Sequence, residues 1–334
     1  MTNTTLWRLL WRRYRVLLGT ALVVMGLVGI KAATDLVGTV GNLFTKHGYI
    51  TGNADSLLMF MTFVVVTVLG WAIFAWDHHT DFNHYLFALP VTRRRIYRQK
   101  LQLLLTTVAG SYVLMHGLFL GVLGLIKRST MTYNLNWAND LRYCVSQLMF
   151  LLAVLMVAMT CGLWLGQIFA SALTTVIFMA SWLFAINGFS TILMDLTGIQ
   201  LWRVHWIYYF DQSTWSGFSI LVLGSLAVIV ALYYLDRWAF EHLSLEETGE
   251  YFLLPQFRQT LLWLVIVYLT VAVSFSSFGH LIIQMVTNHY VADLPLYQNV
   301  LLAVVVAYLT WSIGRLILYR PDQVRTAFKF KKIA

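Results

Sequence analysis

Charged residues are scarce in this 334-residue chain: Asp, Glu, Lys and Arg make up 11% of it, against about 25% in a typical soluble domain. Hydrophobic residues make up 59%. Several runs of roughly twenty residues carry almost no charge, which is typical of membrane-spanning helices. These runs do not alternate with a period of two, which excludes the tilted strands of a membrane barrel. The composition predicts an all-α, polytopic integral membrane protein.

Cysteine is almost absent as well. The chain has 2 cysteines, Cys144 and Cys161, so a disulfide framework and a CxxC metal site are excluded. The phosphate-binding pattern GxxxxGK[ST] is missing, and the nearest string, GLVGIK at 26–31, has the wrong spacing. We therefore expect this chain to bind no ATP, cofactor or metal. The hydrolase patterns HExxH and GxSxG are also missing, which disfavours a membrane enzyme.

About eight apolar runs are long enough to cross a bilayer. They cover Val16–Ile30, Leu57–Trp76, Leu103–Ile126, Val145–Leu165, Ile168–Gly188, Trp215–Leu235, Leu261–Ile283 and Asn299–Leu318. Lys31 and Asp35 end the first run early, and the break at Gly166-Gln167 is very short.

The basic residues orient these spans. If both termini are cytoplasmic, about three quarters of the Lys and Arg residues fall in inner segments, as the positive-inside rule expects. The inner segments are 1–15, 77–102, 166–167, 237–260 and the basic tail 319–334. This topology explains the net charge of +9 without nucleic acid as a partner. It predicts a multi-pass protein of a bacterial cytoplasmic membrane whose basic ends contact membrane lipid.

The N-terminal residues 1–15 have an amphipathic pattern at helical spacing, with Arg8, Arg12 and Arg15 on one face. The pattern predicts a helix lying in the cytoplasmic headgroup layer. The alternative is an ordinary basic flank of the first span.

The loop at 77–102 holds the densest basic cluster. Pro90 is expected to stop the helix of the second span, and Thr92 to cap a short new helix. In that helix Arg94, Arg95 and Arg98 share a face. Such a helix suits an acidic groove or anionic lipid headgroups. Simple positive-inside anchoring is the alternative.

The string LPVTRRRIYRQK, residues 89–100, resembles the signature between the second and third spans in permease subunits of ABC exporters of the type 2 class. The residues that match it are Leu89, Pro90, Val91, Thr92 and Arg93 in the core and Ile96 and Lys100 in the looser tail. The glutamate-rich stretch common before this core in the family is replaced here by DHHTDFNH. A second string, EETG at 246–249, resembles an element that follows the sixth span in one branch of the family.

The resemblance implies a six-span permease core at 16–236, with the coupling-helix loop at 77–102 and two additional spans over 261–318. It implies that this loop, including Arg94, Arg95 and Arg98, contacts a separate ABC ATPase subunit that binds ATP and Mg. The chain itself would then be no enzyme, and a second permease, identical or related, would complete the translocation path. An ion-coupled secondary transporter is the remaining alternative, although the span centres are nearly free of ionisable groups.

Several other residues have two possible interpretations each. His116 lies in the middle of the third span, where it faces a translocation path or simply bonds a neighbouring helix. The pairs Gly117/Gly121 and Gly162/Gly166 have GxxxG spacing, which suits packing within the subunit or a dimer seam. The aromatic residues in 189–213 form an interfacial belt or a re-entrant helix. The histidines of HHTDFNH are read as a hydrated lead-in rather than a metal site.

Overall fold

The computed structural model describes residues 3–39, 44–45, 48–49, 53–126, 137–197, 215–243, 251–287, 296–319 and 328. This part of the chain is mainly helical and includes two short antiparallel strands, β1 (Phe44–Thr45) and β2 (Gly48–Tyr49). Within it, 6 helices are long and apolar enough to cross a bilayer, or up to 8 spans if each of two bent helix pairs is one span. The chain is therefore an all-helical, multi-pass membrane protein.

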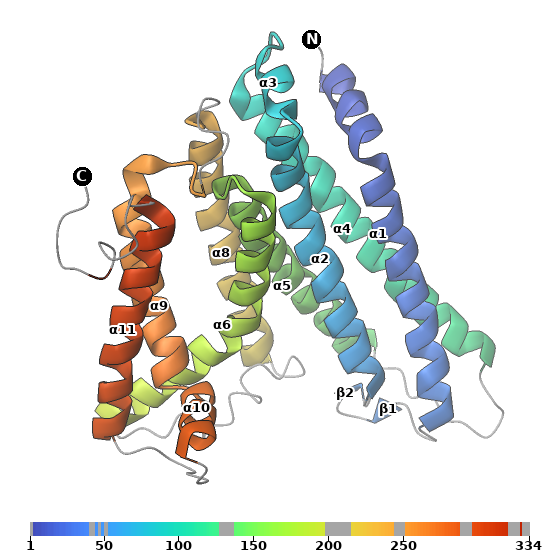
Figure 1. The fold of residues 1–334 in the computed structure, drawn as a ribbon. Helices are drawn as coiled ribbons and strands as arrows, with labels where there is room; N and C mark the ends of the chain where they lie inside the picture. Colours follow the sequence, from blue (N-terminus) through green and yellow to red (C-terminus); the bar gives the residue numbers. More distant parts are fainter. Residues whose placement is uncertain are drawn as a thin grey trace. The chain divides into compact units, whose positions relative to one another are not determined.

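The chain divides into two compact units. Figure 1 labels the helices of both. Unit 1 holds α1 (Asn3–Thr39), α2 (Asn53–His79), α3 (Phe82–Phe87), α4 (Arg93–Ile126), α5 (Trp137–Trp164) and α8 (Trp215–Glu241). Unit 2 holds α6 (Ile168–Thr197), the 3-10 turn η1 (Pro255–Phe257), α9 (Arg258–Ser274), α10 (Ser277–Thr287) and α11 (Leu296–Tyr319). The sequence predicted a different division, after a core ending at residue 236. In the structure the fifth predicted span, α6, belongs with the C-terminal helices.

Helix α1 is one continuous helix of 37 residues rather than an interfacial segment followed by a span. Leu6, Leu10 and Tyr14 recur every fourth residue and are buried, so the N-terminal turns pack inside unit 1 on the same stripe as the rest of the helix. The helix also passes through Lys31 and Asp35, which were expected to end it. These two side chains form an i,i+4 ion pair at 2.5 Å on the helix surface, which suits a helix rather than a break.

Two glycines of unit 1 lie where helices approach closely. A Cβ on Gly162 of α5 would lie 2.4 Å from the carbonyl oxygen of Trp71 on α2, and one on Gly29 of α1 would lie 2.4 Å from that of Met115 on α4. Gly162 was predicted as a packing residue. Gly117 and Gly121, predicted with it, have no described atom within 4 Å of such a Cβ, and Gly166 lies between α5 and α6. The GxxxG pattern therefore marks a close contact on α5 but not on α4.

The seventh predicted span is broken in unit 2. Helices α9 and α10 meet at a bend of 66°. The Ser276 hydroxyl donates to the Ala272 carbonyl at 2.5 Å and accepts the Phe278 N–H at 3.1 Å, as an N-cap residue does. The Ser277 N–H donates to Asn187 Oδ1 of α6 at 3.1 Å. Side chains thus satisfy the backbone groups that the break releases.

Several predictions fall on residues outside the described part of the chain. They concern most of the aromatic stretch, including Trp202 and Trp206, the EETG string at 246–249, and the basic tail apart from Phe328.

Candidate functional site at the start of helix α4

A compact segment, residues 80–92, joins helices α2 and α4. We call this segment together with the first two turns of α4 the elbow, residues 80–100. Asp81 has a φ of 53°, a left-handed conformation that few residues other than glycine adopt, and it turns the chain sharply after α2. Helix α3 follows at once. The Val91 N–H then donates to the Leu89 carbonyl at 2.7 Å, which closes a second tight turn before α4 begins at Arg93.

Pro90 and Thr92 lie at the second of these turns. Helix α2 ends at His79, so Pro90 follows the short α3 and does not end the helix of the second span. The new helix does begin after Thr92, whose carbonyl accepts the N–H groups of Arg95 and Ile96 at 2.9 and 3.2 Å. It is not a short separate helix, because α4 continues for 34 residues through the predicted third span. The basic residues therefore occupy the end of a long, continuous helix.

The first turns of α4 have a buried face and an exposed face. The inward face carries, at helical spacing, the half-buried Arg93 and the buried Ile96, Tyr97 and Lys100. The exposed face carries Arg94 and Arg98. The residues of the sequence motif are thus divided. Ile96 and Lys100, from its tail, face the interior of unit 1, and Arg94 and Arg98 face outward.

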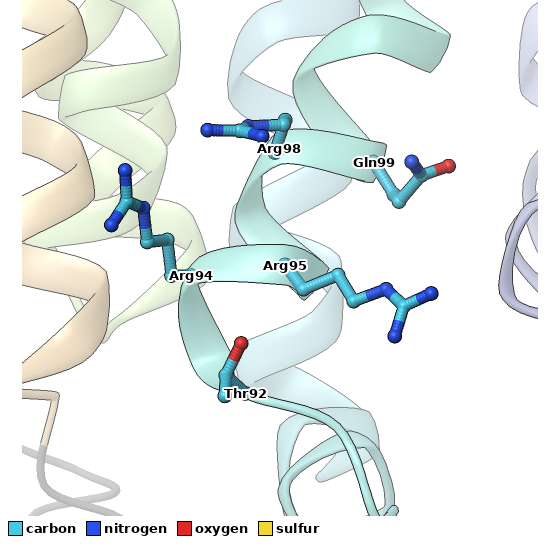
Figure 2. Close-up of a pocket in the computed structure, with 5 residues that line it drawn as sticks. All are labelled: Thr92, Arg94, Arg95, Arg98 and Gln99. Carbon is cyan, nitrogen blue, oxygen red and sulfur yellow. The ribbon is translucent and has the colours of Figure 1, made fainter. Parts of the chain in front are cut away.

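Arg94, Arg95 and Arg98 line a recess of about 350 Å³ together with Thr92 and Gln99, which we call the arginine recess. Figure 2 shows Arg94 and Arg98 projecting to one side of the helix and Arg95 and Gln99 to the other. The predicted shared face therefore holds for Arg94 and Arg98, whereas Arg95 extends away from them.

The recess is electropositive for two reasons. Three of the residues that line it carry guanidinium groups, and the first turn of α4 contains no acidic residue. The free N–H groups of a helix N-terminus add a partial positive charge at the same place. Guanidinium groups bind carboxylates and phosphates through paired hydrogen bonds. The arrangement can therefore hold an acidic group of a partner.

Arg93 fastens the opposite face of the same turn. Its Nη1 donates to the carbonyls of Glu241 and Leu243 at 3.0 and 2.9 Å, at the end of α8. Its guanidinium also lies 4.2 Å from the centre of the Phe87 ring on α3. Because the last carbonyls of a helix lack partners within the helix, Arg93 satisfies groups that would otherwise be left open.

Lys100 lies farther along α4, inside unit 1, in a cluster of polar side chains. Its Nζ is 2.5 Å from Asp77 Oδ2, and both side chains are 0% exposed. The Tyr14 hydroxyl donates to the same carboxylate oxygen. Asn83 Oδ1 lies 3.4 Å from Nζ, and Asn83 Nδ2 is 3.1 Å from His78 Nδ1. We call these five residues the Asp77 cluster.

Aromatic rings enclose the Asp77 cluster. Lys100 Nζ lies 5.1 Å from the ring centre of Phe74 and 5.4 Å from that of Phe240. The Tyr97 ring packs against both, at 6.3 and 5.8 Å between centroids. A second fully buried acid, Asp236, accepts the Thr160 hydroxyl at 3.0 Å and so links α8 to α5.

The sequence pattern predicted a contact role for Lys100 and no role in the site for Asp77, Tyr14 or Asp236. A signal was present in the sequence: Asp77 and Asp236 are single acids at the ends of long apolar runs. A charged side chain within or next to a membrane span costs free energy unless it has a partner. Each of these acids therefore marks a polar contact between helices. The identity of the partner follows only from the packing.

The other predicted residues lie apart from this site. His116 is half-buried among the rings of Tyr112, Phe119 and Tyr143, with centroid distances of 4.8, 6.3 and 6.5 Å. This is a packed aromatic setting, and its part in a translocation path stays a prediction. In the described part of the chain, no three His, Cys, Asp or Glu side chains are grouped as metal ligands.

Comparisons with protein-family models, with curated proteins and with solved structures find no match to this chain.

Proposed function

We propose that this chain is the permease subunit of an ATP-driven exporter of the ABC type 2 class and that the elbow couples it to a separate ATPase subunit. The observation that carries the proposal is the division of the first turns of α4. One face presents Arg94 and Arg98 outward, and the other is fastened by Arg93 and Lys100. A basic surface on a rigid support suits the transmission of force better than a flexible loop does.

The mechanism follows from this arrangement. ATP and Mg bind to the partner ATPase, and closure of two ATPase subunits moves their contact surface. The elbow follows that surface, and α4 carries the movement into the membrane because it is continuous from Arg93 to Ile126. This chain contributes the translocation path and no catalytic residue.

The partner surface is expected to be acidic. Asp and Glu carboxylates would bind the guanidinium groups of the arginine recess, with the helix N-terminus adding to the attraction. Anionic lipid headgroups would serve as a second contact for the exposed arginines of α1, Arg8, Arg12 and Arg15.

The proposal includes a topology. The starts of α1 and α4 and the ends of α2 and α8 meet at one end of unit 1 through the contacts of Tyr14, Lys100 and Arg93. That end carries the basic clusters of unit 1, so it is assigned to the cytoplasm together with the N-terminus. The basic residues of the tail 319–334 assign the C-terminus to the cytoplasm by the same rule. The membrane is a bacterial cytoplasmic membrane. A second permease, identical or related, completes the transporter.

Site-specific cross-linking tests the proposal. A photoreactive benzoylphenylalanine is placed at position 94 or 98 of the tagged full-length chain in its native host, and a matched control is placed at Val113, an exposed residue farther along α4. The expected product at 94 and 98, and not at 113, is an adduct with a polypeptide that contains a GxxxxGK[ST] loop. The purified complex should hydrolyse MgATP, and vanadate should inhibit it.

Two results would contradict this function. Cross-linking of positions 94 and 98 to lipid alone would indicate a headgroup site rather than a docking surface. Purification of the chain without any ATPase, together with hydrolase activity or ion-driven uptake by the chain alone, would favour a membrane enzyme or a secondary transporter.

A further inference from the structure

Lys100 matches the tail of the coupling motif, but it cannot touch a partner. Its side chain and that of Asp77 are both 0% exposed, and the rings of Phe74 and Phe240 lie close to its ammonium group. A contact role is therefore assigned to the exposed arginines, and Lys100 needs a different explanation.

The Asp77 cluster joins four helices at one point. Tyr14 belongs to α1, Asp77 to α2, Asn83 to α3 and Lys100 to α4. Tyr14 and Lys100 both bond to a single oxygen atom, Asp77 Oδ2. Asn83 reaches Lys100 from the elbow at 3.4 Å and holds His78 on α2 at 3.1 Å. The start of α4 therefore cannot rotate or shift without breaking contacts to α1 and α2.

We infer that Asp77 and Lys100 are positioning residues that fix the start of α4 against α1 and α2, so that a push on the elbow moves the three helices together. The inference rests on the proposed function for its purpose, but the joint itself is a property of the chain alone. A buried ion pair is seldom needed for stability, because apolar residues of the same volume often serve as well. The ion pair fixes how the helices are arranged. Each buried charge needs its partner at one position, whereas apolar side chains can pack in several arrangements.

Distance measurements between spin labels test the joint without any partner. In a background with Cys144→Ser and Cys161→Ser, labels are placed at Arg12→Cys on α1 and Arg98→Cys on α4, both exposed. A control pair, Val23→Cys and Val113→Cys, reports on the outer parts of the same two helices. The chain is reconstituted in lipid nanodiscs, and the width of each distance distribution is measured by pulsed electron resonance.

The test variant is Asp77→Asn with Lys100→Met, which removes both charges and keeps similar volumes. The distribution for 12/98 should broaden about twofold or more, while that for 23/113 stays unchanged. An unchanged 12/98 distribution would overturn the inference, because Ile96 and Tyr97 would then suffice to hold the helix. Equal broadening of both pairs would overturn it as well, since the pair would then support the whole bundle rather than position the elbow.

Tyr14→Phe provides the second variant, in case the double variant does not give folded protein. It keeps the ion pair and removes only the hydrogen bond from α1 to Asp77. The 12/98 distribution should still broaden, and an unchanged width would overturn the link between α1 and the joint. This outcome is independent of the ATPase, so it stands or fails separately from the proposed function.

A second readout connects the joint to coupling. Once cross-linking has identified the ATPase, its affinity for the Asp77→Asn/Lys100→Met variant is measured without the cross-link. This affinity should lie within about threefold of the wild-type value, because the arginine recess is intact. Its stimulation of ATP turnover should fall about tenfold, because the elbow no longer moves with α1 and α2. Loss of affinity and stimulation in equal measure would assign the pair to the docking surface after all.

Discussion

Arg93 and Arg94 are adjacent in the chain and have opposite surroundings. Arg93 donates to the carbonyls of Glu241 and Leu243 at 3.0 and 2.9 Å, whereas Arg94 is exposed and lines the arginine recess. One residue of an α-helix turns the side-chain direction by about 100°. A run of three arginines at a helix start therefore supplies an anchor and an exposed basic surface at the same time.

This difference predicts opposite effects of two neighbouring substitutions on stability. Arg93→Ala leaves two carbonyls at the end of α8 without their charged donor, so the free energy of unfolding should fall by about 2 kcal/mol or more. Arg94→Ala removes an exposed side chain and should change it by less than about 0.5 kcal/mol. Thermal unfolding of the purified chains, followed by size-exclusion chromatography, measures both. Equal losses would show that Arg93 is no anchor.

The proposed function predicts that replacing Arg94, Arg95 and Arg98 together with alanine uncouples the ATPase while the chain remains inserted and folded. The reason is that these residues line the recess and leave the Asp77 cluster intact. The affinity of the triple variant for the ATPase identified by cross-linking should fall about tenfold or more. The affinity of the wild-type chain should decrease as the salt concentration rises, because exposed charges are screened. Binding in nanodiscs and stimulated ATP turnover are the measurements. Full coupled activity in the triple variant would contradict the docking function.

The positions of the helices could be predicted from sequence, because apolar runs of about twenty residues have few alternatives in a bilayer. The run Trp215–Leu235 lies within α8, and the break at Gly166-Gln167 lies between α5 and α6. Helix ends could not be predicted as well. Arg93 to Gln102 are polar enough to interrupt an apolar run, yet they continue α4, since Arg, Lys and Gln are good helix formers.

The partners in the site were beyond prediction for a different reason. Lys100 and Asp77 are 23 residues apart, and Tyr14 and Asp77 are 63 apart. Nothing in the local pattern chooses Asp77 over Asp81 as the partner of Lys100. The choice is made by the turn at Asp81, whose positive φ reverses the chain after α2 and leaves that residue exposed while Asp77 stays inside.

The two kinds of GxxxG glycine should respond differently to a methyl group. Gly162→Ala places a Cβ 2.4 Å from the Trp71 carbonyl oxygen, so α2 and α5 must separate, at an expected cost of about 1–3 kcal/mol. Gly117→Ala meets no described atom within 4 Å and should leave stability within about 0.5 kcal/mol. Thermal unfolding compares the two. A loss of stability in Gly117→Ala accompanied by a smaller oligomer would identify that face as the seam with a second permease.

The bend between α9 and α10 offers a test of unit 2 that uses the special properties of proline. Asn187→Ala removes the acceptor of the exposed Ser277 N–H, so the free energy of unfolding should fall by about 0.5–1.5 kcal/mol and amide exchange at the start of α10 should rise. Ser277 is the first residue of α10. Proline is well tolerated at that position, because the N–H of the first residue makes no hydrogen bond within the helix. In a Ser277→Pro background, Asn187→Ala should therefore have little further effect. Hydrogen exchange and thermal unfolding of the four chains measure the coupling, and additive losses would mean that Asn187 stabilises α6 by some other contact.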